Sequence, residues 1–355
     1  MTAFDSADGL ALRRAVCAAP DDDLPRLVLA DYLDESGDAA DADRAAFIRA
    51  QCELEGVPWM SKRWREIDRT AEGLRAKHRK AWPASVARLG VMVPHWGRGF
   101  IESVQVHAKR FTRESGRRLL DTEPVREIRL INLRGAGGLG VAEFVNHRIV
   151  SRLRKLDFGT TGLEGHEVEA VAAAGWGALA GLQALALRWA VGADAARGLP
   201  RLLRSLPRLT TLSPEFWYPS RDSSQQSAAL AGAVAAASGE PAFARLENLT
   251  LSGAAASAVI ALCRSPHLGG LKRLHLSDCE VTPEAVAELA RAASLTALEV
   301  LDLSGNAALF DADVRVLAGA AFAPTLQVLV VRRCGLARAN AKRFAGLFPH
   351  AEVVV

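Results

Sequence analysis

A leucine pattern that returns along the chain constrains the fold more than any other feature. Leucines occupy positions 1, 4 and 6 of the segment that begins at Leu271, and the same arrangement starts again at Leu298. Alternate residues of a strand point to the same face, so positions 4 and 6 predict one apolar face of a short strand. One such unit cannot bury its own leucines, and each unit must therefore stack on the next.

The pattern has further copies on both sides of this pair. From Leu153 onward, successive copies are 29, 27, 37, 25, 27 and 28 residues apart. The strand segments are followed by helical spacing of apolar residues, as in TPEAVAELARAA, where we expect Thr282 as the N-cap and Pro283 as the first helical residue. Clear copies begin at Leu153, Leu182, Leu246, Leu271, Leu298 and Leu326, and weaker copies begin at Ile101, Val125 and Leu209.

This period, with a strand and a helix in each unit, resembles the leucine-rich repeat of the ribonuclease-inhibitor type. The last three copies also have the Cys or Asn expected at position 9, in the form of Cys279, Asn306 and Cys334. The resemblance covers residues 100 to 355, approximately. It implies an α/β fold, namely a right-handed leucine-rich-repeat solenoid with an inner parallel β-sheet, outer helices and a broad concave surface.

The first 60 residues contain a different pattern. The run from Cys17 to Leu54, together with WGRGFIESV from Trp96, resembles the bacterial repeat-companion domain, with Tyr32 in place of the usual Trp. The resemblance implies a small α-helical module ahead of degenerate repeats and no established activity. We therefore expect a helical module with a basic amphipathic helix at 1–95, which covers the open apolar end of the first repeat, and a solenoid at 96–355. The matching residues are Pro20, Asp22, Asp23, Arg26, Leu27, Ala30, Asp31, Leu33, Glu35, Gly37, Asp38, Arg44, Ala45, Phe47, Ile48 and Gln51.

The positions of the carboxylates in this module favour a structural role over metal binding. Asp21, Asp22 and Asp23 precede an apolar helix, where carboxylates cap amide groups and interact with the positive end of the helix dipole. We expect Arg26 and Arg44 to form ion pairs with nearby carboxylates, namely Asp31, Asp34 or Glu35. A calcium or magnesium site is the weaker alternative, because DESGDAADAD only loosely approaches the spacing of a cation-binding loop.

Charge is distributed unevenly along the chain. The net charge is +4, yet residues 1 to 60 carry −8 and residues 61 to 120 carry +10. The segment 61–82 combines apolar residues at helical spacing with eight Lys and Arg residues, which predicts a basic amphipathic helix. Three interpretations remain open: a solvated face or docking on the acidic block, nucleic-acid binding, and binding to an anionic membrane surface.

No motif indicates an enzyme. The chain lacks G-x-S-x-G, a P-loop and H-E-x-x-H. Cys263, His267, His275 and Cys279 superficially have zinc-like spacing, but the repeat places them on different sides of one unit. We therefore expect a non-enzymatic protein without catalytic residues, metal ligands or cofactors.

Two features bear on the compartment. The five cysteines are scattered and odd in number, which argues against a disulfide framework. The first residues contain neither a basic leader nor a continuous apolar segment, and no apolar run of about 18 residues follows. We expect a cytoplasmic protein with no transmembrane segment.

Partner binding is expected on the strand positions that the leucines do not occupy, because those side chains point away from the core. The 37-residue interval after Leu209 contains the aromatic run at 216–218 in SPEFWYPSRDSSQQS. We expect a protruding loop that forms a lip at one edge, and the alternative is a loop that folds back over its own repeat. A mixture of aromatic, Arg and polar residues suits a protein partner. The residues expected to bind it are Arg188, Trp189, Phe216, Trp217, Tyr218, Arg273, His275 and Asp302.

Overall fold

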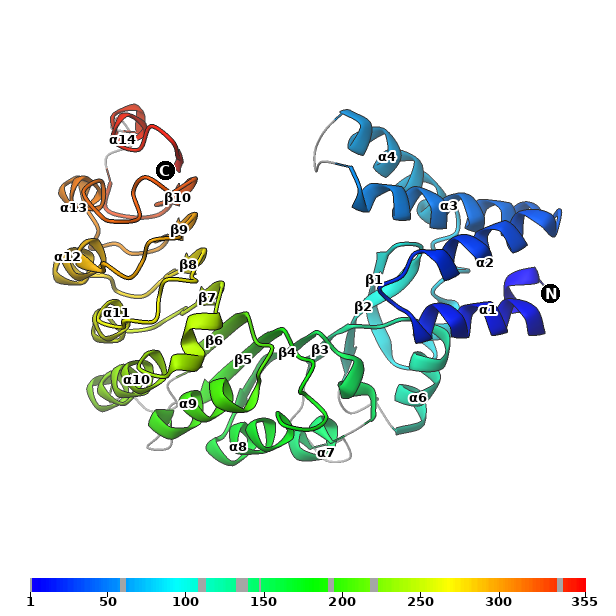
Figure 1. The fold of residues 1–355 in the computed structure, drawn as a ribbon, viewed down its shortest axis with the longest axis horizontal. Coiled ribbons are helices and arrows are strands. Elements are labelled where there is room, and N and C mark those ends of the chain that lie inside the picture. The colour runs from blue at the N-terminus through cyan, green and yellow to red at the C-terminus, as the bar shows by residue number, and fades with distance from the viewer. Residues whose placement is uncertain are drawn as a thin grey trace. The chain divides into compact units, whose positions relative to one another are not determined.

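The computed structural model forms two compact units. The first comprises Met1–Gly140 with His147–Leu153, and the second comprises Val141–Asn146 with Arg154–Val355. Figure 1 labels most of the helices and strands of both units. The structure describes residues 2–57, 62–107, 113–131, 140–146, 148–190, 195–217, 223–336 and 341–355.

The first unit begins with helices, and its three strands follow with one helix between the second and the third strand. Strands β1 and β2 are antiparallel, whereas β2 and β3 are parallel. The helices are η1 (Ala3–Asp5), α1 (Ala7–Ala18), α2 (Leu24–Glu35), α3 (Ala39–Glu55), α4 (Lys62–Lys77), α5 (Ala84–Ala87), α6 (Arg113–Thr122) and η3 (Arg148–Arg152). The strands are β1 (Val91–Gly97), β2 (Phe100–His107) and β3 (Glu127–Ile131).

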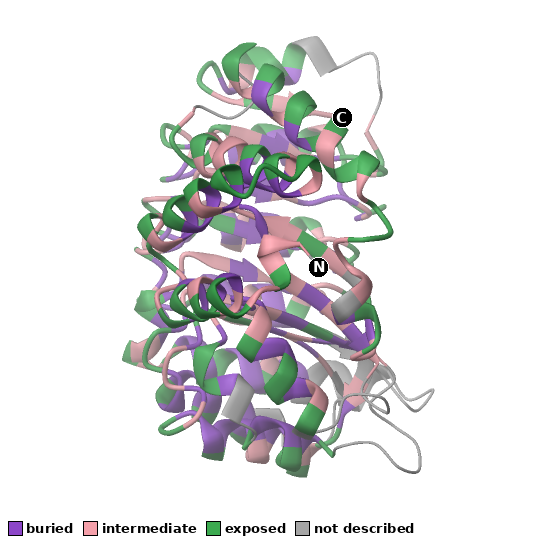
Figure 2. Cartoon of the chain, turned by 90° about the vertical axis from the view of Figure 1, so that its right-hand side faces the viewer, coloured by how far each residue is buried: buried purple, intermediate pink, exposed green. Residues whose placement is uncertain are grey.

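Apolar residues from α1, α2, α3 and β2 form one core in this unit. Its fully buried members are Val16, Leu29, Ala30, Leu33, Ala45, Ile48 and Phe100. The start of α3 is fixed by Asp38, whose carboxylate accepts hydrogen bonds from the backbone amides of Ala40 and Asp41. Helices in Figure 2 carry both buried and exposed residues, as expected when one side of each helix packs on a core.

The turn between β1 and β2 packs directly on α3. Arg98 and Gly99 both have positive φ angles, 48° and 84°. A Cβ on Gly99 would lie 2.7 Å from the Cα of Ile48, so only glycine fits at this contact. The amide of Gly99 donates to the side chain of Gln51 at 2.8 Å. This contact joins the two sequence segments that carry the repeat-companion resemblance.

The compact units do not coincide with the expected division between residues 95 and 96. His95 lies within β1, opposite Ser103 of β2, so that position falls inside a strand pair of the first unit. The first unit also contains β3, in register with β2 from Ser103 to His107. The weaker repeat copies at Ile101 and Val125 therefore supply strands of the first unit.

One of the three aspartates before α2 makes a capping hydrogen bond of the expected kind. Asp22 accepts a hydrogen bond from the amide of Leu24 at 2.9 Å. Asp23 occupies the N-cap position without a side-chain hydrogen bond, and Asp21 pairs with Arg126.

The expected ion pairs of Arg26 and Arg44 were wrong. Arg26 pairs with Glu102 of β2 at 2.6 Å, whereas Arg49 pairs with Asp31 and Asp34. The physical reason is burial. Arg26 and Arg44 face the core, but Asp31 and Asp34 lie on the exposed side of α2.

The second unit alternates strands with helices throughout. In Figure 1 its strands run along one side and its helices along the other. The strands are β4 (Lys155–Leu163), β5 (Ala184–Ala190), β6 (Thr211–Trp217), β7 (Asn248–Thr250), β8 (Arg273–His275), β9 (Val300–Asp302), β10 (Val328–Val330) and β11 (Glu352–Val354). The helices are α7 (Val141–Val145), α8 (Gly165–Ala174), α9 (Ala195–Ser205), α10 (Ser223–Ser238), η4 (Pro241–Arg245), α11 (Ala256–Cys263), α12 (Pro283–Arg291), α13 (Asp311–Leu317) and α14 (Ala341–Leu347).

Strands β4 to β11 follow each other in chain order as parallel neighbours. Their central leucines are in register, as Leu249, Leu274, Leu301 and Leu329 show, and these side chains are no more than 1% exposed. Thr282 caps α12 by accepting from the amide of Ala285. The α/β solenoid with a parallel sheet and flanking helices, and the cap at Thr282, are confirmed.

The long interval after Leu209 differs from the expected protruding loop. Phe216 and Trp217 are the last residues of β6, which pairs with β5 over seven positions from Ala184↔Thr211 to Ala190↔Trp217. Helix α10 then occupies 16 residues, and η4 follows it. The additional length is therefore largely secondary structure, since backbone pairing with β5 extends the strand into the aromatic run. Tyr218 lies outside the described residues.

The position-9 residues connect neighbouring repeats through hydrogen bonds. The side-chain oxygen of Asn306 accepts from the amides of Cys279 and Val281, each at 3.0 Å. Its side-chain nitrogen donates to the carbonyls of Leu276 and Leu303. Asn306 is 1% exposed, so its removal would leave buried backbone groups without partners.

We predict that Asn306→Ala lowers the free energy of unfolding by about 3 kcal/mol or more, because four buried hydrogen bonds are lost together. Urea unfolding of the full chain measures the effect. Cys334→Ala is the matched control, since Cys334 holds the same repeat position but is only partly buried. Equal losses in the two variants would contradict the bridging role of Asn306.

Candidate functional site on the strand face

The strand residues that flank the buried leucines form continuous rows. One row runs through Thr250, His275, Asp302 and Val330, which are opposite one another in β7 to β10. These residues are partly exposed, whereas the leucine beside each of them is buried. Alternation along the strand thus separates a core face from an accessible face.

Asp302 is in contact with several polar groups. One oxygen accepts from the amide of Ser304 at 2.8 Å, and the other lies 3.3 Å from the hydroxyl of Ser277 and 3.5 Å from Nδ1 of His275. Partial burial acts to raise the pKa of Asp302, but the hydrogen bonds from Ser304 and His275 outweigh it, so the net pKa is lowered. Asp302 is therefore an anion at neutral pH.

Two arginines on other positions of the sheet, one in β8 and one in β5, make similar polar contacts. Arg273 donates to the side-chain oxygen of Asn248 in β7 at 3.1 Å. Arg188 of β5 lies 3.4 Å from the carboxylate of Glu215, its register partner in β6. Glu215 was not among the expected site residues. The sequence could have identified it, because Arg188 and Glu215 occupy the same position of successive repeats.

The structure brings the expected site residues together to different extents. His275 and Asp302 are direct neighbours, and Arg273 lies in the same strand as His275. Arg188 lies three strands away in β5, at a separation of about 14 Å for strands about 4.8 Å apart. The backbone register places Trp189 opposite Phe216, and Trp217 ends the same strand. The side chains of these three aromatic residues lie outside the described part of the structure, as does all of Tyr218.

The zinc-like set is distributed over the repeat. Cys263 lies in α11 and His275 in β8, while the thiol of Cys279 donates to the carbonyl of Leu251. Burial raises the pKa of Cys279 to about 12, so its thiol stays protonated at neutral pH. Among the described residues, no group of three His, Cys, Asp or Glu side chains could hold a metal ion. None of the helices in the described part of the chain is long and apolar enough to cross a membrane.

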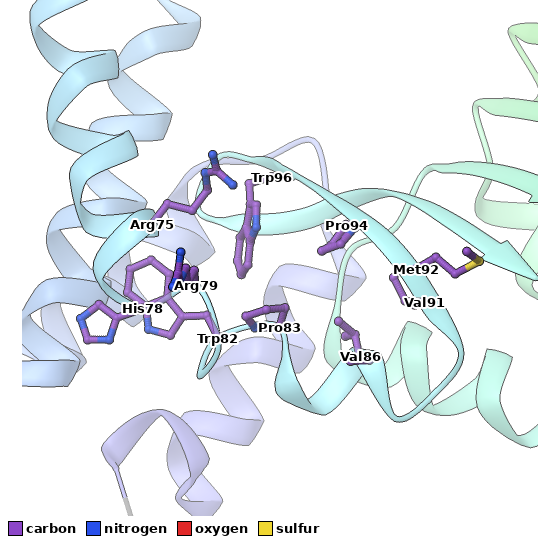
Figure 3. Close-up of a pocket in the computed structure, with 11 residues that line it drawn as sticks. Arg75, His78, Arg79, Trp82, Pro83, Val86, Val91, Met92, Pro94 and Trp96 are labelled. Atoms are coloured by element: carbon purple, nitrogen blue, oxygen red, sulfur yellow. The ribbon is translucent and has the colours of Figure 1, made fainter.

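The first unit contains a pocket that the sequence did not predict. It has a volume of about 370 Å³, with Trp82, Trp96, Pro83 and Pro94 among its lining residues. Figure 3 shows Arg75 next to Trp96, with His78 and Arg79 close to Trp82. The rings of His78 and Trp82 are stacked, with centroids 4.6 Å apart. Chain segments from the basic block and from β1 form this pocket together, which is why no local motif revealed it.

Comparisons with known proteins add little to this description. No protein-family model matches the chain, and no curated protein matches it. It is similar to a chain in the crystal structure of a Rad7 and Elc1 complex from yeast, with 13% identity over 99% of this chain and 98% of that chain and a TM-score of 0.41. It is also similar to an internalin from Listeria monocytogenes, with 11% identity over 80% of this chain and 93% of that chain and a TM-score of 0.26. Because these scores are low, the class rests on the stacked strand–helix units themselves, which define a leucine-rich-repeat-like fold.

We predict that Asp302→Asn lowers stability by less than about 1 kcal/mol at neutral pH, since the group is partly exposed. The lowered folded-state pKa means that the carboxylate stabilises the fold above its unfolded pKa of about 3.9 and loses this effect as the pH falls through the folded value. Urea unfolding at neutral and acidic pH should show the variant and the parent converging in acid. Glu352→Gln, at an exposed position of β11, is the control. A difference that does not change with pH would contradict this account of Asp302.

Proposed function

We propose that the chain is a non-enzymatic scaffold or adaptor that binds a protein partner on the strand face of its second unit. One observation carries the proposal. A row of partly exposed residues, polar in β7 to β9 and ending at Val330 of β10, runs in register next to buried leucines. Side chains in such a row have fixed spacing, so they can match a complementary surface without further ordering of the backbone.

The chemistry of the row fits a protein partner. Arg273 and Asp302 supply opposite charges, and His275 provides a ring between them, with 35% of its side chain exposed. Arginine and aromatic residues are enriched among the residues that dominate protein–protein binding energies. Polar groups that are already hydrogen-bonded, such as Asp302, suit the rim of such an interface.

The proposed contact region extends towards β5 and β6. Arg188 and Trp189 lie in β5, and Phe216 and Trp217 end β6 opposite it. With Tyr218, this aromatic run forms the proposed edge of the binding surface. Trp, Tyr and Phe contribute large contact areas at interfaces, which supports an anchoring role.

We assign the helices of the first unit to the repeat-companion class as part of the same proposal. The Gln51–Gly99 hydrogen bond and the Arg26–Glu102 ion pair support this assignment, because each joins the two segments that carry the resemblance. The helical module at 1–95 and the solenoid at 96–355 remain the proposed sequence modules. The strand pair β1–β2 spans their boundary.

The proposal predicts that Arg273→Glu combined with His275→Ala weakens capture of the partner from a lysate of the native host. Each residue that acts as a hot spot should account for about 2 kcal/mol or more of binding free energy. Affinity is then measured by calorimetry with the captured protein after mass spectrometry identifies it. Thermal melts of the same preparations establish that the double variant is folded.

Arg291→Glu is the matched control, because Arg291 belongs to the same repeat but lies on α12, with 73% of its side chain exposed. Loss of capture in the strand variant alone supports the strand face as the binding surface. Equal capture by the parent and both variants would refute it.

Nucleic-acid binding through residues 61–82 is the second candidate function. Arg63 pairs with Glu53 and Lys77 with Asp43, so part of the basic block is neutralised by the acidic block. Arg75 pairs with Glu72 of the same helix, and within the described residues the remaining exposed cations of α4 and the segment after it have no carboxylate within 4.0 Å. They are Lys62, Arg65, Arg69, Arg79 and Lys80. Salt-dependent enrichment of nucleic acid instead of protein in the same capture experiment would favour this candidate.

A further inference from the structure

A buried arginine in the first unit lacks the partner that a buried charge normally requires. Arg44 of α3 is only 3% exposed, and its Nε is buried without a hydrogen-bond partner. Among the described residues, no carboxylate lies within 4.0 Å of its guanidinium group. Burial of an unpaired charge is costly, so this arrangement needs a physical explanation.

Aromatic rings surround the guanidinium group. Its central carbon lies 4.7 Å from the ring centroids of both Trp82 and Trp96 and 4.8 Å from that of Phe4. Phe47 and Phe100 lie within 5.8 Å. These rings stabilise the cation through their π faces, and they fix its orientation. They do not provide the in-plane oxygen acceptors that a guanidinium fork matches.

Arg44 also lines a cavity of about 310 Å³, separate from the pocket of Figure 3 but sharing Trp82 and His78 with it. Phe4, Ala40 and Ala84 contribute apolar surface to this cavity, which is of a size suited to a small ligand. The site therefore combines a partly open cavity, an apolar wall and a buried cation.

Of the other charged side chains that line the cavity, Asp41 and Arg13 have contacts within the protein, and Arg88 is exposed. The carboxylate of Asp41 accepts from the amides of Ala3 and Phe4 and from the hydroxyl of Ser36. Arg13 lies 3.8 Å from Asp5 and 3.6 Å from Glu123. Arg44 is thus the buried cation of this cavity without a carboxylate in contact.

The geometry of Arg44 indicates the class of ligand. Its guanidinium group is buried without a contacting carboxylate and matches one carboxylate group of a ligand. A carboxylate offers two coplanar oxygens to the two donor edges of a guanidinium group. Inorganic phosphate is partly a dianion at neutral pH, and its second charge would be costly next to the apolar part of the cavity.

We propose that this cavity binds a small organic monocarboxylate, with the carboxylate on Arg44 and the organic group against Phe4 and Trp82. The proposal concerns the first unit and is independent of partner binding on the strand face. It gives Arg44 a role that the repeat-companion resemblance does not supply.

Calorimetric titration of the full chain with benzoate tests the proposal, with acetate and inorganic phosphate as comparison probes. We expect benzoate to bind most tightly, because its ring adds apolar contact. Arg44→Met should abolish the benzoate signal or weaken it at least about tenfold, equivalent to about 1.4 kcal/mol. Arg44→Lys should bind more weakly than the parent, because lysine keeps the charge but lacks the planar fork.

Ala40→Leu provides a second test that can be used if substitution of Arg44 prevents folding. This change fills the cavity without altering any charge, and it should also weaken benzoate binding by at least about tenfold, or about 1.4 kcal/mol. Arg79→Gln is the matched control, because Arg79 lines the neighbouring pocket and not this cavity. It should bind benzoate like the parent.

Two results would overturn the proposal. Failure of the folded parent to bind benzoate or acetate, or equal binding by the parent and Ala40→Leu, would show that Arg44 is held by the aromatic rings alone. Tighter binding of phosphate than of benzoate would contradict the assignment to a monocarboxylate.

Discussion

Leucine side chains of one repeat become buried only against the next repeat, and this dependence determines the arrangement of the second unit. Leu274 lies between Leu249 and Leu301 in neighbouring strands, and all three are no more than 1% exposed. Stacking fixes the strand register, and the register in turn aligns the residues on the opposite strand face. The position of His275 beside Asp302 is therefore a consequence of core packing.

Backbone groups at the end of each strand impose a second requirement. The chain turns away from the sheet there, and its amides and carbonyls need partners. Asn306 meets this need between two repeats, because its amide group both donates and accepts. Cys279 does so with one thiol donor to Leu251. Apolar stacking and these polar bridges act on the same interface, so each repeat depends on its neighbour for both.

Two buried arginines of the first unit have different surroundings. Arg26 is completely buried but pairs with Glu102, so its charge is compensated within the protein. Arg44 is nearly as buried, yet it contacts aromatic rings and no carboxylate among the described residues. Burial lowers the pKa of Arg44 to about 10, which still leaves it charged at neutral pH. This contrast distinguishes a structural ion pair from a cation that is available to a ligand.

The sequence predicted the features that depend on local periodicity. The strands, the cap at Thr282 and the position of Asn306 follow from residues within one repeat. The length of β6 could not be predicted in this way, because its pairing with β5 carries the strand through Phe216 and Trp217. The partner of Arg26 lies 76 residues away in sequence, and no local pattern identifies such a contact. The two pockets were missed for the same reason, since separate segments enclose them.

Site-specific photo-crosslinking in the native host tests the central claim most directly. A photoreactive residue is placed at position 273 on the strand face, at 217 at the end of β6, or at 291 on α12. The account predicts that position 273 forms an adduct with one defined protein, that position 217 reaches the same protein, and that position 291 does not. An adduct from 291 with none from 273 would contradict binding on the strand face.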